Sequence, residues 1–245
     1  MAQKKPLLYR FIKGSVRFFY RKMTVVGQEN LPDTPCLVVS NHAKMNGPIA
    51  CELYFPGKRY TWCIGQMMHR KEVAEYAFQD FWSKKPAWSH WFYRLLAHLI
   101  APLSEHIFQN ADTIGVYKDG RALTTFKTTV KRLEEGANVV IFPEHDVPYN
   151  HIVCQFQDKF VDVARLYYKR TGKALSFVPM YIAPDLGQMI LGEGIAFDPN
   201  APMDEERARI CHYLMDAITD LALAQPPHTV VPYPNMPKRT YPMSK

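Results

Sequence analysis

Two clusters of polar side chains stand out because each directly follows a strongly apolar run. Asn41 and His42 follow the run CLVVS, and Glu144, His145 and Asp146 follow the run NVVIFP. Such side chains can exchange protons with a substrate, and histidine does so readily because its pKa lies near neutral pH. In the structural alternative, which stays open for each cluster, Asn41 and Glu144 are turn and cap residues.

Apolar runs that predict strands alternate with helical patterns along most of the chain. The predicted strands are 36–40, 60–64, 114–117, 138–142, 175–182 and 189–197. The predicted helices are 48–55, 71–82, 88–100, 121–135, 159–170 and 205–223. This alternation predicts an α/β fold with a mixed, largely parallel sheet flanked by helices. Because ligands bind beyond the carboxyl ends of strands in open α/β sheets, the two polar clusters together favour one functional cleft.

The positive charge of the chain is concentrated at its N-terminus. Of 30 basic and 23 acidic residues, seven basic ones and no acidic one lie before Glu29, so the remainder is balanced. Apolar and basic residues recur on opposite sides of a helix over residues 1–24, which is typical of a helix in the membrane interface. A helix docked on its own domain is the alternative. We expect one α/β domain at 25–224 and an extended proline-rich tail at 225–245.

Composition excludes several other classes of protein. An apolar run of 18 residues, as a spanning helix needs, is lacking. Five cysteines without C-x-x-C spacing argue against a disulfide framework and a zinc site, so no metal is expected. Confinement of the excess charge to one segment argues against a nucleic-acid partner. For the aromatic region around Trp82, Trp88 and Trp91, core packing is favoured over an apolar ligand tunnel or a second membrane contact.

Four motifs occur in the order in which they occur in a known family. They are NHAKMNGP at 41–48, GVYK at 115–118, FPEHD at 142–146 after a Leu-x-x-Gly, and Val178–Pro179. In this ordered set the chain resembles the glycerolipid acyltransferase superfamily of the lysophosphatidic acid type. The resemblance covers roughly residues 24–200. It implies transfer of a fatty acyl group from acyl-CoA or acyl carrier protein, as co-substrate and without a cofactor, to a hydroxyl of a lysolipid or glycerolipid.

The resemblance implies that His42 is the general base, but the chain departs from the motif beside it. Gly47 stands where the family has an aspartate that would orient the imidazole. Asp146 is the favoured replacement, Glu144 is an alternative carboxylate, and Asn46 could hold the ring by a hydrogen bond. In a further alternative, catalysis is lost and the protein is a lipid-binding pseudoenzyme.

The arginine that follows the FPE motif in the family is absent, which puts a phosphate-bearing acceptor in doubt. An anionic group on the acceptor or the thioester carrier could instead be bound by basic side chains. For Lys44 and Arg121, a solvated surface charge is an equally open reading. The candidates for substrate binding are Asn41, Lys44, Asn46, Lys118, Arg121 and His145. With the N-terminal helix, these expectations describe a peripheral protein on the cytoplasmic face of the membrane.

Overall fold

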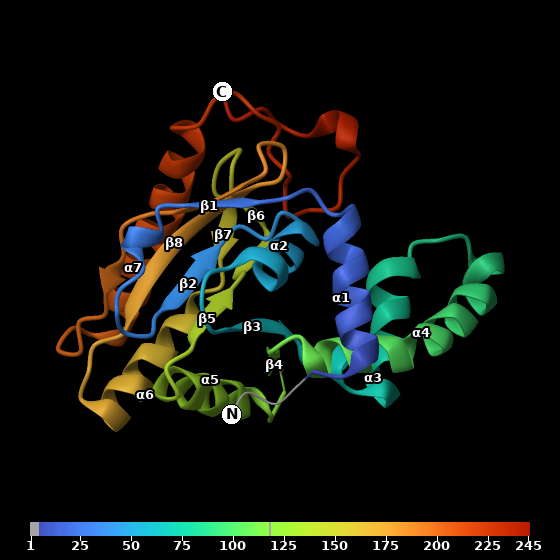
Figure 1. Cartoon of the computed structure of the whole chain (residues 1–245), viewed down its shortest axis with the longest axis horizontal. Coiled ribbons are helices and arrows are strands. Elements are labelled where there is room, and N and C mark those ends of the chain that lie inside the picture. The colour runs from blue at the N-terminus through green and yellow to red at the C-terminus, as the bar shows by residue number, and fades with distance from the viewer. Residues whose placement is uncertain (1–4, 118) are drawn as a thin grey trace. The chain divides into compact units, whose positions relative to one another are not determined.

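The computed structural model describes residues 5–117 and 119–245, so the predicted substrate-binding residue Lys118 lies outside the described residues. The α/β fold predicted from the alternation of strands and helices is confirmed (Figure 1). The chain divides into two units, of which the smaller contains the residues up to Phe18 together with Tyr60–Thr125. The larger contains Phe19–Arg59 and Phe126–Lys245.

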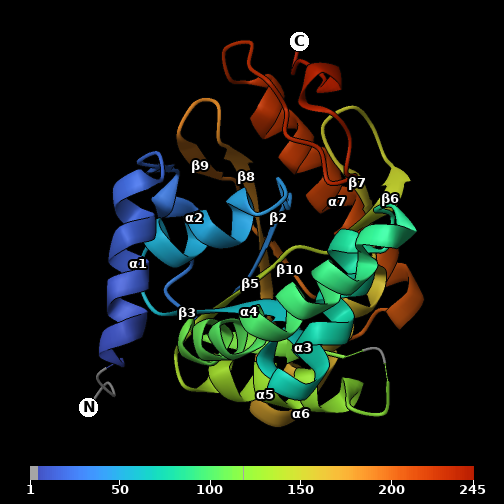
Figure 2. The same ribbon diagram turned by 90° about the vertical axis from the view of Figure 1, so that its right-hand side faces the viewer.

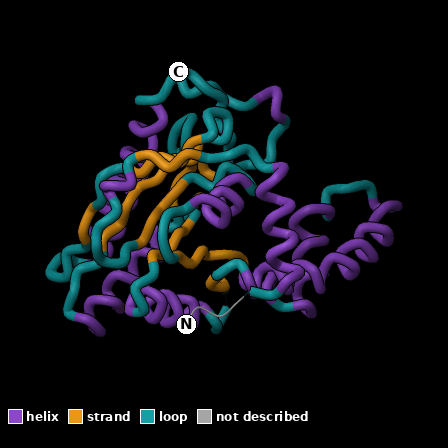
Figure 3. Tube along the Cα trace, viewed as in Figure 1, coloured by secondary structure: helices purple, strands orange, loops and turns teal. Residues whose placement is uncertain are grey.

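A mixed, mostly parallel sheet forms the centre of the larger unit. Its strands are β1 (Thr24–Val26), β2 (Leu37–Ser40), β5 (Asn138–Ile141), β8 (Ser176–Ala183), β9 (Gln188–Leu191) and β10 (Ile195–Ala196). The order is β1-β9-β8-β2-β5, and β10 also pairs with β8. Strand β2 runs parallel to both β5 and β8, whereas β9 and β10 run antiparallel to β8. Figure 3 draws the strands in orange. Strands β2 and β8 end at the same end of the sheet, because Ser40 lies opposite Met180.

Helices cover both faces of this sheet because the side chains of its strands alternate in direction. Helix α2 (Asn46–Tyr54) buries Ala50 and Cys51 against Val38 and Val178 on one face. Phe177 points to the other face and contacts Phe160 of the short helix at Asp158–Val161. Helix α7 (Met203–Leu223) packs on β8 and on that short helix. Figure 2 shows α2 and α7 on either side of β8.

Two further elements complete the framework of the larger unit. Helix α6 (Asp162–Thr171) ends at Gly172, whose φ of 69° is the left-handed conformation that glycine adopts without strain. Strands β6 (Glu144–Pro148) and β7 (Cys154–Phe156) form a separate antiparallel pair. The second polar cluster of the sequence therefore lies on a hairpin that follows β5.

The C-terminal segment folds back on the larger unit. His228 is buried, and its Nε2 is 2.8 Å from the hydroxyl of Tyr181 in β8. Thr229 forms an isolated antiparallel bridge with Met243, so residues 228–244 make a closed loop. We call this segment the C-terminal loop; Figure 1 shows it in red. Its proline-rich composition predicts the extended backbone, and buried polar contacts hold its two ends together.

The smaller unit is mainly helical. It contains α1 (Leu7–Phe19), α3 (Arg70–Ala77), α4 (His90–Asn110) and the parallel strands β3 (Arg59–Ile64) and β4 (Thr113–Val116). Short helical turns lie at Gly65–Met68, Phe78–Trp82 and Ala87–Ser89, and α5 (Ala122–Glu134) continues across the boundary between the units. Among residues 5–117 and 119–245, every helix is too short or too polar to cross a bilayer.

The aromatic residues near α4 differ from the core packing expected for them. Trp82 is half-buried and stacks on Tyr93, with 5.5 Å between ring centroids. Trp88 and Trp91 instead leave 80 % and 69 % of their surface exposed. Helical periodicity identifies an apolar face but does not reveal what that face contacts, so the expectation was wrong for these two residues.

Candidate active site

The end of β2 is fastened to β8 by the side chain of Asn41. Its Nδ2 donates to the carbonyl of Ile182 at 3.1 Å, and its Oδ1 accepts from the Ile182 N–H at 2.8 Å. The amide thus continues the hydrogen-bond ladder one residue beyond β2, in a place where an unpaired polar group would be costly. Asn41, predicted to bind substrate, is buried, and its position fixes the start of the turn that carries His42.

The imidazole of His42 is oriented by the backbone of its own turn. Ala43 and Lys44 have φ values of 45° and 55°, an uncommon conformation for residues with side chains. This left-handed turn carries the carbonyl oxygen of Lys44 back to Nδ1 of His42, where it accepts a short hydrogen bond. Because the carbonyl can only accept, Nδ1 carries the proton and Nε2 keeps a free lone pair in the neutral ring.

The surroundings of His42 favour its neutral form. Burial lowers the pKa of His42 below its ordinary value, and the bond to the Lys44 carbonyl opposes that effect only in part. The ring lies between Phe142, with centroids 5.2 Å apart, and Tyr233, at 5.7 Å. A neutral imidazole with an unprotonated Nε2 is the form that can accept a proton from a substrate hydroxyl.

The carboxylate of Glu144 holds the backbone of the His42 turn rather than the ring. Its Oε2 accepts from the N–H of His42 at 2.5 Å, and its Oε1 accepts from the N–H of Cys154 in β7 at 3.0 Å. Glu144 is 2 % exposed, and this burial raises its pKa to about 7 although both N–H donors favour the ionised form. The residue therefore ties the end of β2 to the hairpin after β5.

Gly47 allows the backbone to approach His42 where a side chain could not. The N–H of Gly47 donates to the carbonyl of His42 at 3.1 Å. A Cβ at this position would lie 2.5 Å from that carbonyl oxygen and 2.7 Å from Cε1 of Phe142. The start of α2 has thus closed over the space that the aspartate of the resembled motif would need. In this chain the ring is oriented by the hydrogen bond that His42 Nδ1 donates to the Lys44 carbonyl.

Asn46 supports the turn from the other side. Its Nδ2 donates to the carbonyl of Ala43 at 3.0 Å, and the hydroxyl of Tyr20 donates to its Oδ1 at 3.2 Å. The tyrosine hydroxyl also lies 3.2 Å from the Asn46 carbonyl. The Asn46 amide, expected from the sequence to hold the imidazole or bind substrate, is therefore engaged with backbone and with Tyr20.

His145 and Asp146 follow Glu144 on β6 but are less buried than it is. His145 is half-buried, and its Nδ1 accepts a weak bond from the N–H of Val147 at 3.4 Å. Asp146 is exposed, and among the described residues it forms no hydrogen bond with the His42 ring. The partnership of Asp146 with His42 stays a prediction, whereas the bond that His42 donates to the Lys44 carbonyl is present.

The C-terminal loop contributes residues that sequence reasoning missed. The Nζ of Lys44 donates to the hydroxyl of Tyr241 at 2.6 Å and to the carbonyl of Met236 at 3.3 Å. Tyr233 of the same loop packs against the imidazole of His42. The tip of the C-terminal loop therefore lines the His42 turn. Two tyrosines within a proline-rich segment were the available signal, since rigid aromatic residues rarely lie in a tail without a contact.

Arg121 belongs to the smaller unit and is already paired there. Its guanidinium contacts Glu72 at 2.9 Å and Asp119 at 2.8 Å, and it lies 4.0 Å from the centroid of Tyr117. These carboxylates raise the pKa of Arg121 further above its ordinary value. The side chain has the charge expected of an anion-binding residue, but two carboxylates occupy it.

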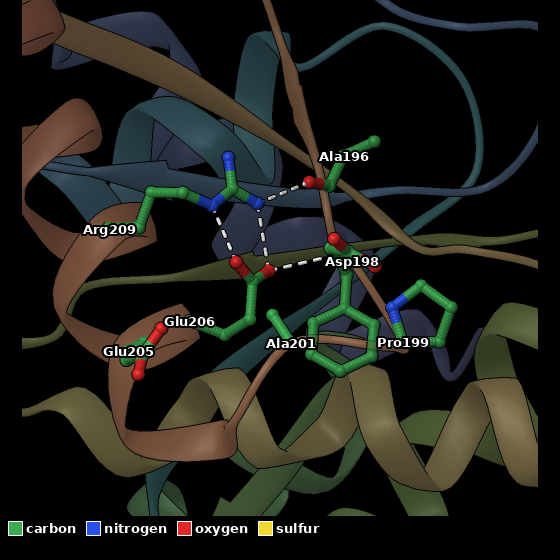
Figure 4. Close-up of a pocket in the computed structure, with 8 residues that line it drawn as sticks. Ala196, Asp198, Pro199, Ala201, Glu205, Glu206 and Arg209 are labelled. Atoms are coloured by element: carbon green, nitrogen blue, oxygen red, sulfur yellow. Dashed lines mark hydrogen bonds and ion pairs between the residues drawn. The ribbon is translucent and has the colours of Figure 1, made fainter.

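A shallow hollow lies at the other end of β8. Arg209 and Glu206 form an ion pair beside Ala196, and Asp198 and Pro199 complete the rim (Figure 4). Ala196 pairs with Ser176 at the start of β8, whereas Asn41 is bonded to Ile182 near its end. Arg209 is paired with Glu206, whereas the hollow's other charged residues, Asp198 and Glu205, are both acidic. In the part of the chain that the structure describes, no cluster of His, Cys, Asp and Glu could hold a metal ion.

Comparison with known proteins relates this chain to one protein family. A profile described as Acyltransferase matches residues 22–183, which include the His42 turn and the Glu144 hairpin. The solved structure of the 1-acyl-sn-glycerophosphate (LPA) acyltransferase PlsC from Thermotoga maritima is similar in fold, with a TM-score of 0.50 and 15 % identity. The alignment covers 89 % of this chain and 79 % of that chain. No curated protein matches the chain.

Proposed function

The chain belongs to the Acyltransferase family, and from this premise we propose that it moves a fatty acyl group from a thioester to a lipid hydroxyl. The donor is acyl-CoA or acyl carrier protein, and the acceptor is a lysolipid or glycerolipid. The observation that carries the proposal is the bond from His42 Nδ1 to the Lys44 carbonyl. It fixes the tautomer in which Nε2 is free to accept a proton.

The reaction requires one proton transfer and one exchange of bonds at the acyl carbon. Nε2 of His42 takes the proton of the acceptor hydroxyl while the hydroxyl oxygen attacks the carbonyl carbon of the thioester. The C–O bond forms and the C–S bond breaks. The sulfur leaves with the electron pair of that bond and takes the proton back from the imidazolium. The products are an ester and a free thiol, and no redox step is involved.

The ammonium of Lys44 is the proposed contact for an anionic group on the acceptor or the carrier. It is half-buried beside the His42 turn, where it donates to oxygen atoms of Tyr241 and Met236 and lies 4.8 Å from the centroid of the Tyr241 ring. These partners carry no negative charge, so an anion could still bind the ammonium. Charge-assisted hydrogen bonds to phosphate are a common use of such a lysine.

Attachment to the cytoplasmic face of a membrane is proposed through α1. Its most exposed apolar residues are Leu7, Leu8, Phe11, Phe18 and Phe19, and Val16 is exposed to a smaller extent. Arg10 and Arg17 lie on the opposite side of the helix at roughly 100° per residue. Large apolar surface is thus exposed along α1, and basic residues would meet anionic headgroups. We expect Leu7→Gln with Phe11→Gln to weaken binding to anionic vesicles.

The test of catalysis is release of free thiol from acyl-CoA in the presence of a lysolipid. His42→Ala should reduce acceptor-dependent release by at least about 100-fold, because general bases contribute on the order of 10²–10⁴. His212→Ala is the matched control, since His212 is exposed on α7. Equal rates for the wild type and His42→Ala would contradict the proposed mechanism.

A lipid-binding protein without catalytic activity is the second candidate. It is favoured by Gly47, which replaces the carboxylate that would stabilise an imidazolium. In that case vesicles and lysolipid bind normally while neither the wild type nor the variant releases thiol from any thioester donor. The two candidates thus differ in one measurement on the unmodified protein.

A further inference from the structure

Helix α4 turns its largest apolar side chains away from the protein. Trp91 and Leu99 are 69 % and 68 % exposed, and Trp88, just before the helix, is 80 % exposed. Phe92, Leu95 and Leu103 are also exposed. Exposed apolar residues scattered singly are normal, but a continuous row on one element marks an interaction surface. We call these six side chains the α4 stripe.

The α4 stripe lies opposite the face by which the helix packs on its own unit. At about 100° per residue, positions 91, 92, 95, 99 and 103 fall within an arc of roughly 120°. The buried residues of α4 are small ones, Ala97, Ala101 and Ser104, and they lie on the other side. Ala97 packs in a cluster with Ala74 and Ala77 of α3. This distribution, with small residues inside and bulky apolar ones outside, is the reverse of a helix covered by water.

The charges around the α4 stripe favour a lipid surface as its partner. Between Asp80 and Glu105 the chain has no acidic residue, but it has three basic ones, Lys84, Lys85 and Arg94. All three are exposed. Tryptophan prefers the boundary between headgroups and acyl chains, and lysine or arginine beside it meets anionic phosphates. A row of apolar side chains edged by positive charge is complementary to an anionic leaflet.

We propose that the α4 stripe is a second membrane-binding surface, separate from α1, which inserts into the interface of an anionic leaflet. The proposal deepens the proposed function, on which it rests for the presence of a lipid substrate. The two helices belong to the same unit, and Lys5, just before α1, pairs with Asp112, just after α4, at 2.6 Å. Two attachment points hold a protein at a membrane far more firmly than one, because the second binding event is intramolecular.

The experiment measures cosedimentation of the full chain with phosphatidylcholine vesicles that contain phosphatidylglycerol. Leu95→Gln combined with Leu99→Gln should lower the partition coefficient about ten-fold, since two apolar side chains no longer leave water. Leu123→Gln is the matched control, because Leu123 is exposed on α5 outside the stripe. This control variant should bind the vesicles as the wild type does.

A second measurement reports insertion directly. Lipids brominated near the headgroup should quench the tryptophan fluorescence of the wild type. In the variant Trp88→Phe with Trp91→Phe, most of this quenching should disappear although the protein still binds. Unchanged vesicle binding of Leu95→Gln/Leu99→Gln, or quenching that survives the loss of both tryptophans, would overturn the proposal. The proposal would also be overturned if the wild type self-associated and these substitutions dissociated it without changing its binding to vesicles.

The design separates this proposal from the proposed function. With a short-chain lysolipid below its critical micelle concentration, Leu95→Gln/Leu99→Gln should release thiol at the wild-type rate, whereas His42→Ala should not. If His42→Ala were as active as the wild type while the stripe variant lost vesicle binding, the enzymatic mechanism would fail and the membrane surface would stand.

Discussion

The Nδ1 of His42 is bonded to the carbonyl oxygen of Lys44, two residues further along the same turn. In the resembled motif an aspartate would orient the imidazole, but here Gly47 occupies that position and the backbone has closed around it. A carbonyl dipole fixes the tautomer as a carboxylate does, although it stabilises the protonated ring less. The four predictions below examine this turn, the carboxylate that holds it and the C-terminal loop that contacts it.

Restoring the motif aspartate should impair the protein. In Gly47→Asp the new Cβ would lie 2.5 Å from the His42 carbonyl oxygen, so the turn must move. We expect a loss of about 1–3 kcal/mol in the free energy of unfolding, typical of overpacking, and slower thiol release. Urea unfolding and the thiol assay measure both, with Gly120→Asp as control because a Cβ there meets nothing within 4 Å. A faster enzyme would contradict this account of the glycine.

Stability should fall as pH rises through the range in which Glu144 ionises. Burial raises the pKa of Glu144 from 4.5 to about 7, so the folded state holds a proton that the unfolded chain has lost. This contribution is fully present below pH 4.5 and is lost as pH rises through about 7, a change of about 3 kcal/mol. Urea unfolding at several pH values, compared with Glu144→Gln, should show this difference in slope. Parallel curves for the two proteins would exclude it.

Acyl transfer should persist in mildly acidic solution. Burial lowers the pKa of His42 below 6.5, its ordinary value, and only the neutral ring can act as a base. The acid limb of kcat/KM for thiol release should therefore lie below pH 6.5. Measurement of the limb in Glu144→Gln separates the two groups, since that variant keeps the histidine. A limb at or above the ordinary histidine value would show that the ring is not buried as described.

Loss of one hydroxyl in the C-terminal loop should affect the site. Tyr241→Phe removes the acceptor that lies 2.6 Å from Nζ of Lys44, which should cost about 1–2 kcal/mol of stability. The freed ammonium should also change the KM for the anionic substrate more than kcat. Tyr213→Phe is the matched control, because it also removes one tyrosine hydroxyl, which donates to the Glu193 carbonyl at 2.9 Å and does not contact Lys44. Identical KM values for both variants would argue against a role of the loop in substrate binding.

Much of the fold could be predicted from the sequence because it follows from local patterns. The run CLVVS gives β2 and NVVIF gives β5, and the two strands pair in parallel with Val38 opposite Val140. Periodicity placed α2 and α7 within a few residues of their bounds. The segment 189–197 was predicted as one strand, but it forms β9 and β10 with Gly192 between them, since strand propensity does not report a break in pairing.

The contacts within the site were less predictable because they depend on backbone conformation and distant residues. Ala43 and Lys44 adopt the left-handed conformation although neither is a glycine or an asparagine, so the sequence does not predict it. This conformation allows the bond between His42 and the Lys44 carbonyl. Glu144 was an alternative to Asp146 as a carboxylate for the ring, but its carboxylate accepts from two backbone N–H groups. Tyr233 and Tyr241 approach through the closure of the C-terminal loop, which no local pattern encodes.

The contact between Lys44 and Tyr241 joins residues 197 positions apart, which bears on how the protein is made. During translation the turn around His42 leaves the ribosome early, whereas Tyr233 and Tyr241, which cover it, emerge much later. Until then the nascent chain carries the rings of Phe142 and His42 without Tyr233. A message cut short before codon 233 would yield a polypeptide that has the strands of the sheet but lacks the aromatic cover of the His42 turn.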